Sequence, residues 1–90
     1  MVGTVTGAYT PFKTEISTDE MDVFKKATGQ LLGVKYQPLA VSTQVVSGIN
    51  YKFFCNSTPV YPDAITTPVM VKIYKQLDGT VHLLEIEKID

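Results

Sequence analysis

The spacing of the apolar residues changes at Gly33, and this change constrains the fold more than any other feature of the chain. Before Gly33 the apolar residues follow helical spacing, in the set Met21, Phe24, Ala27 or Thr28, Leu31 and Leu32. After Gly33 apolar and polar residues alternate, as they do in strands that bury one face. The pattern predicts an α+β chain in which one amphipathic helix packs on a sheet.

A capping box marks the start of the helix, because Ser17 is followed three residues later by Glu20. In such a box the serine hydroxyl accepts a hydrogen bond from the glutamate amide, and the carboxylate accepts one from the serine amide. Gly33 supplies a left-handed stop, so we expect the helix over Thr18–Leu32. Gly29 within this range either lies where another backbone comes close or shortens the helix.

Two pairs of strands follow, and each pair is joined by a short turn that contains glycine. Turns of this kind are typical of tight antiparallel hairpins. Ser47-Gly48 forms the first turn and Asp78-Gly79 the second, and the proline-rich stretch 57–68 is a loop between the hairpins. The predicted strands are 39–45, 49–56, 69–74 and 80–89, with a further short strand over 9–15.

The expected fold is a single domain over residues 1–90, with an antiparallel β-sheet of four to five strands wrapped on one α-helix. The connectivity has a geometric consequence. Each hairpin turn reverses the chain, and so does the loop between the hairpins. The turns at Ser47-Gly48 and Asp78-Gly79 should therefore lie at the same end of the sheet.

Composition argues against several classes of function. All eight basic residues are lysines and the net charge is −1, so the planar fork with which arginine grips phosphate or reads guanine is missing. Nucleic acid is therefore not an expected partner. No apolar run reaches the roughly 18 residues that a membrane span needs. The start of the chain lacks the features of a secretory signal, and the single cysteine fits a reducing compartment, so we expect a cytoplasmic protein.

No residues form a convincing catalytic or metal site. Cys55 falls on the same strand face as Tyr51 and Phe53, which predicts a buried, inert thiol rather than a partner of His82. His82 is expected to be a surface or sheet histidine. The acidic residues 19, 20 and 22 are explained by the helix N-terminus, which favours negative charge. We expect no enzymatic activity, no metal and no cofactor.

The residues around the first turn resemble a known family. Gln44-Val45-Val46-Ser47-Gly48 is similar to the Gln-x-Val-x-Gly loop of the cystatin superfamily of cysteine-protease inhibitors. Gly7-Ala8-Tyr9-Thr10-Pro11 is similar to the N-terminal glycine segment of several cystatin-like chains. The resemblance runs from about Val5 to Glu87, and the lack of disulfides resembles the intracellular stefin branch.

This resemblance implies an inhibitor that blocks the cleft of a papain-like cysteine protease reversibly and competitively. Three segments would enter the cleft together: the N-terminal stretch and the two hairpin turns. The protease-binding residues that the resemblance implies are Gly7, Ala8, Gln44, Val45, Val46, Ser47, Gly48, Leu77 and Asp78.

The second turn departs from the family pattern. Leu77 is retained from the Leu-Pro of the stefins, but Asp78 stands where proline would, and the chain has no tryptophan. Because buried aromatic anchors commonly contribute ~2 kcal/mol or more, we expect weaker binding through this turn than in tryptophan-bearing relatives.

Other interpretations stay open. The chain can be a non-inhibitory interaction module on a cystatin-like fold, or, more remotely, a small enzyme on a related helix-on-sheet fold, since a fold does not determine a function. We expect a monomer. The first hairpin can also act as a hinge, and opening it would give a domain-swapped dimer that loses the turn.

Overall fold

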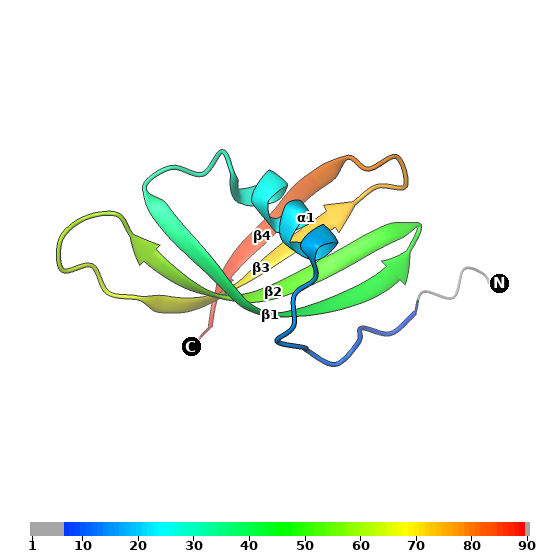
Figure 1. The fold of residues 1–90 in the computed structure, drawn as a ribbon, viewed down its shortest axis with the longest axis horizontal. Coiled ribbons are helices and arrows are strands. Elements are labelled where there is room, and N and C mark those ends of the chain that lie inside the picture. The colour runs from blue at the N-terminus through cyan, green and yellow to red at the C-terminus, as the bar shows by residue number, and fades with distance from the viewer. Residues whose placement is uncertain (1–6, 90) are drawn as a thin grey trace.

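One helix lies against one face of a four-stranded antiparallel sheet in the computed structural model, which describes residues 7–89 (Figure 1). The strands follow one another in the sheet in their chain order. The elements are α1 (Thr18–Thr28), β1 (Val34–Val46), β2 (Gly48–Pro59), β3 (Thr67–Lys75) and β4 (Val81–Lys88). The predicted α+β class and the two predicted hairpins are confirmed.

The predicted capping box opens α1. The Ser17 hydroxyl accepts a hydrogen bond from the Glu20 amide at 3.1 Å, and the Ser17 amide donates to Glu20 Oε1 at 2.9 Å. The helix ends at Thr28, so the predicted extension to Leu32 is wrong. Gly29 favours helix poorly and ends it, and the chain then turns away toward β1. Leu32 consequently lies outside the apolar stripe, with 90% of its surface exposed.

The core is built where α1 crosses the inner face of the sheet. The Phe24 ring lies 4.9 Å from the Phe53 ring, and Phe53 also stacks on Tyr51. Alternate residues of β2 and β3 are buried, as the period of two predicted. The buried apolar residues are Val23, Phe24, Val41, Tyr51, Phe53, Cys55, Val69, Val71 and Ile73.

The segment before α1 follows the edge of β1 without forming a fifth strand. Lys13 and Val41 exchange both backbone hydrogen bonds, at 3.0 and 2.9 Å, and this is the one bridge the segment makes within residues 7–89. The predicted strand over 9–15 is thus reduced to a single bridge, because Pro11 has no amide to donate. The segment still covers β1: the buried Ser42 hydroxyl donates to the Thr10 carbonyl at 2.5 Å.

Each outer strand carries one extra residue that interrupts its pairing. On β1 the register shifts between Pro38 and Ala40, so Leu39 has no partner in β2. On β4 the register steps from Glu85 to Leu83, which leaves Leu84 as a bulge with 58% of its surface exposed. The pairing of β1 is regular from Ala40 onward, but the predicted alternation of burial fails in β1, because neighbouring Val41 and Ser42 are both buried and Val45 is exposed.

The burial of Cys55 gives a test of this core. Cys55 is fully buried on β2, and desolvation raises the pKa of its thiol from 9.0 to about 12. We expect a thiol reagent at pH 8 to modify native protein only as fast as the core opens, and to modify urea-unfolded protein at once. Rapid modification of the native protein would contradict this burial.

The same burial predicts a pH dependence of stability. The fold favours the protonated thiol, and this preference contributes to the free energy of unfolding. The contribution is complete below pH 9 and falls as the pH rises from 9 toward 12, because in that range the thiol of the unfolded chain loses its proton and the thiol of the folded chain keeps it. Urea unfolding across this range should show a smaller loss of unfolding free energy in Cys55→Val than in the parent. The variant has no thiol but a similar volume, so it controls for the other groups that titrate there.

Candidate functional site

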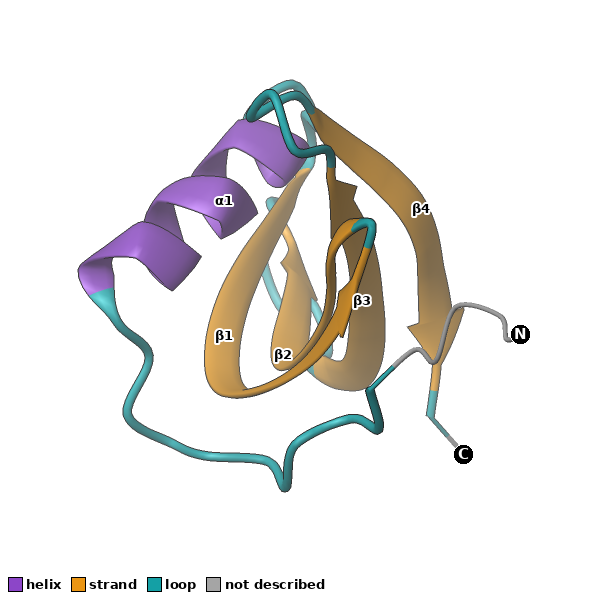
Figure 2. Cartoon of the chain, turned by 90° about the vertical axis from the view of Figure 1, so that its right-hand side faces the viewer, coloured by secondary structure: helices purple, strands orange, loops and turns teal. Residues whose placement is uncertain are grey.

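The two hairpin turns lie at one end of the sheet, as the connectivity predicted. Ile49, which follows the first turn, pairs with Lys75, which precedes the second. Figure 1 shows both turns at the right-hand end of the molecule, and Figure 2 views the molecule from that side. The loops 29–33 and 60–66 lie at the opposite end.

The N-terminal segment brings Gly7 to the same end. Its path runs antiparallel to β1: the Thr10 amide donates to the Thr43 carbonyl at 2.8 Å, and the Gly7 amide donates to the Val45 carbonyl at 3.2 Å. Gly7 therefore lies beside the first turn. A methyl group at Gly7 would be 3.6 Å from the Val45 oxygen, an ordinary contact, so packing within the chain does not require glycine there.

The first turn is tighter than the two-residue connection expected from the sequence. Val46 and Gly48 face each other as the last pair of the ladder, and Ser47 alone joins them. Gly48 has φ = 111°, the positive angle that its position predicted. It is also closely packed, because a Cβ atom there would lie 2.8 Å from the Tyr74 ring and still closer to the Lys75 carbonyl oxygen.

The second turn is held by its own hydrogen bonds. The Gln76 amide donates to the Thr80 carbonyl at 2.8 Å, and the Thr80 amide donates to Asp78 Oδ1 at 2.9 Å. This backbone bond lowers the pKa of Asp78 below its usual value, because it favours the carboxylate. Gly79 has φ = 94°. The turn thus presents Leu77 to solvent, with 82% of its surface exposed.

A shallow groove of about 370 Å³ separates the two turns. Its lining comes from both hairpins: Val45, Val46, Gly48, Ile49, Lys75, Gln76 and Leu77. Val45 and Leu77 are 67% and 82% exposed, so each hairpin contributes one large apolar side chain to this end. None of the lining residues is a carboxylate, a histidine or a cysteine. Besides the amine of Lys75 and the amide of Gln76, the groove offers apolar side chains and backbone groups.

The predicted site residues differ in how accessible they are. Gly7, Ala8, Val45, Ser47, Leu77 and Asp78 are exposed around the turns, and Gln44 and Val46 are half-buried. The Gln44 side chain accepts a hydrogen bond from Asn50 at 3.0 Å. Gly48 is buried beside Tyr74, so it shapes the first turn rather than presenting a surface.

Some residues at this end were not predicted from the sequence. Lys75 and Gln76 line the groove, and Tyr74 packs beneath the first turn. The register between β2 and β3 places them there, with Asn50 opposite Tyr74 and Ile49 opposite Lys75. The local sequence did not give this register, because β2 and β3 are joined by the long loop 60–66 rather than by either glycine turn.

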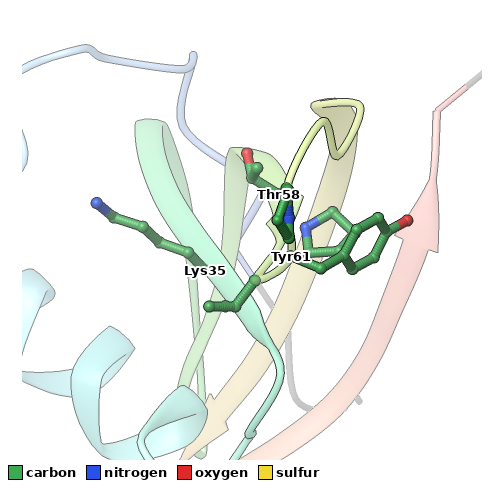
Figure 3. Close-up of a pocket in the computed structure, with 6 residues that line it drawn as sticks. Lys35, Thr58 and Tyr61 are labelled. Atoms are coloured by element: carbon green, nitrogen blue, oxygen red, sulfur yellow. The ribbon is translucent and has the colours of Figure 1, made fainter.

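A second hollow lies at the opposite end of the sheet, and it too was not predicted. It has a volume of about 500 Å³ and is lined by Lys35, Thr58, Pro59, Val60, Tyr61 and Pro62 (Figure 3). Val60, Tyr61 and Ile65 are exposed in the loop that follows β2. The signal available in the sequence was the presence of these large apolar residues in a stretch with the proline content of a loop.

Cys55 and His82 are far apart in the sheet. Cys55 pairs with Val69, whereas His82 pairs with Tyr74, five residues further along β3. In the described part of the chain no three His, Cys, Asp or Glu side chains gather as a metal site would need. Within residues 7–89 no helix has the length and apolar character of a membrane span.

No family model matches this chain, and the searches of curated proteins and of solved structures returned no match.

The packing at Gly48 predicts a large effect of a single methyl group. Gly48→Ala should cost about 1 to 3 kcal/mol of unfolding free energy for the strained angle, and more because the new Cβ meets Tyr74 and the Lys75 carbonyl. Gly79→Ala is the matched control, since Gly79 also has a positive φ but a Cβ there meets nothing within 4 Å. Urea unfolding should show a much larger loss of unfolding free energy for Gly48→Ala than for Gly79→Ala, and equal losses would refute the packing argument.

Proposed function

We propose that this protein is a reversible, competitive inhibitor of papain-like cysteine proteases and has no catalytic activity of its own. The observation that supports the proposal best is the meeting of three segments at one end of the sheet. These segments are Gly7 with Ala8, the first turn and the second turn. They are the segments that the resemblance to the cystatin superfamily would place in a protease cleft.

The chemistry of this end suits occlusion of a cleft. Val45 and Leu77 are exposed on neighbouring hairpins, and the groove between them is lined mainly by apolar side chains, with Lys75 as its one ionisable residue. A backbone that is already held by its own hydrogen bonds loses little conformational entropy on binding, which favours affinity. The proposed inhibition involves no bond cleavage, so the complex would dissociate to intact protein.

We further propose that the inhibitor acts in the cytoplasm as a monomer. The buried single cysteine fits a reducing compartment. Opening of the first hairpin would give a domain-swapped dimer without a first turn, and such a dimer would not inhibit.

A titration of papain tests the proposal directly. Residual activity should fall as folded protein is added, substrate should compete with the inhibition, and dilution should restore activity. A serine protease such as trypsin is the matched control and should keep its activity. Full papain activity at a large molar excess of folded protein would refute the inhibitory function and favour the alternative, a non-inhibitory interaction module on this fold.

A substitution at Gly7 distinguishes a role of this residue in binding from a role in folding. The internal contact of a methyl group at this position is ordinary, so Gly7→Ala should leave the unfolding free energy unchanged. If the backbone at Gly7 approaches the protease closely, inhibition should weaken by about tenfold, which corresponds to about 1.4 kcal/mol. The inhibition constant and the urea midpoint of the same preparation give both quantities. Unchanged inhibition would remove Gly7 from the proposed contact.

A further inference from the structure

A row of four side chains crosses the outer face of the sheet just below the two turns, with one residue from each strand. Gln44 faces Asn50, Asn50 faces Tyr74, and Tyr74 faces His82. Asn50 Nδ2 donates to Gln44 Oε1 at 3.0 Å. Tyr74 and His82 stack with their ring centroids 6.2 Å apart and their planes 15° apart. The row is therefore joined by contacts at both of its ends.

The row reaches the first turn through Tyr74. The Tyr74 hydroxyl donates a hydrogen bond to the Ser47 carbonyl oxygen, the backbone acceptor at the point where the chain reverses. The missing side chain at Gly48 leaves room for the Tyr74 ring, since a Cβ there would lie 2.8 Å from both Cε1 and the hydroxyl oxygen. Gly48 and Tyr74 thus fit together, and the turn is supported from below.

The row reaches the second turn through His82. The imidazole Nε2 lies 3.1 Å from Gln76 Oε1, and Gln76 also closes that turn through its backbone bonds to Thr80 and Gly79. Because His82 stacks on Tyr74, one continuous set of contacts runs from Ser47 through Tyr74 and His82 to Gln76. The two turns are otherwise separated by the groove.

We propose that Tyr74 is a positioning residue that couples the two turns, with His82 as its link to the second. Its hydroxyl holds Ser47 in the closed turn, so the two turns have the relative positions that binding requires before a partner arrives. A bound conformation that is already populated lowers the cost of binding. The coupling itself is a property of the free protein, and only its effect on inhibition rests on the proposed function.

Amide hydrogen exchange measured by NMR tests the coupling without any protease. A neutral hydrogen bond contributes about 1 kcal/mol, which is roughly a fivefold change in an opening equilibrium. Tyr74→Phe removes only the hydroxyl, and exchange of the amides at 46–49 should become about fivefold faster. Tyr36→Phe is the matched control, because Tyr36 is a half-buried tyrosine at the far end of β1. It should leave the amides at 46–49 unchanged.

A double-mutant cycle then tests the link between the turns. His82→Ala should accelerate exchange at 46–49 when the Tyr74 hydroxyl is present, and should have little further effect in Tyr74→Phe. Equal effects in both backgrounds would refute the coupling. So would unchanged exchange at 46–49 in Tyr74→Phe, or an equal acceleration at the amides of 34–37, which would indicate general destabilisation.

The consequence for inhibition is tested last and separately. If the parent inhibits papain, Tyr74→Phe should lower the association rate constant, because fewer molecules hold the closed turn, and should change the dissociation rate constant little. A change confined to dissociation would make Tyr74 a direct contact rather than a positioning residue. If the parent does not inhibit papain, the exchange cycle still decides the coupling, so the two proposals fail independently.

Discussion

The pairing of β2 with a neighbour on each side is the constraint on which the rest of the structure depends. β2 is hydrogen-bonded to β1 along one edge and to β3 along the other. The register of these two pairings therefore determines both which residues of β2 face α1 and where β1 and β3 end. Phe53 is thereby set against Phe24, and Ile49 is set against Lys75. A slip of one residue would turn the apolar side chains outward and also separate the two turns. The core and the candidate site are thus determined by the same set of hydrogen bonds.

Local signals in the sequence predicted the parts of the fold that depend on neighbours in the chain. The Ser17–Glu20 box, the alternation of β2 and β3 and the glycines of the two turns each act within a few residues, and each was found as expected. The end of α1 was predicted too late because helical spacing continues through Leu31 and Leu32. The shorter helix was the alternative that Gly29 offered, and α1 ends at Thr28, directly before that residue.

The features missed from the sequence are those that arise between strands. The unpaired Leu39 is a property of the register between β1 and β2, and nothing in the local pattern of Leu39, Ala40 and Val41 marks it. The candidate site was predicted in part: the convergence of the turns followed from connectivity, and the positive φ of Gly48 from its residue type. The support of the first turn by Tyr74 could not be predicted without the register between β2 and β3. In the sequence pattern alone, a tyrosine on the polar face of a strand looks like any surface residue.

The bulge at Leu84 has a consequence for behaviour at high concentration. The edge of β1 is partly covered by the segment 7–13, but the outer edge of β4 is free within the described residues, and a free edge is a template on which other chains can add strands. Leu84 breaks the regular spacing of that edge halfway along, and Glu85 and Glu87, which pair with Lys72, place charge beside the break. An incoming strand would find only short stretches to pair with. The same sheet that carries bare apolar side chains at its turns therefore has a β4 edge that disfavours the addition of further strands.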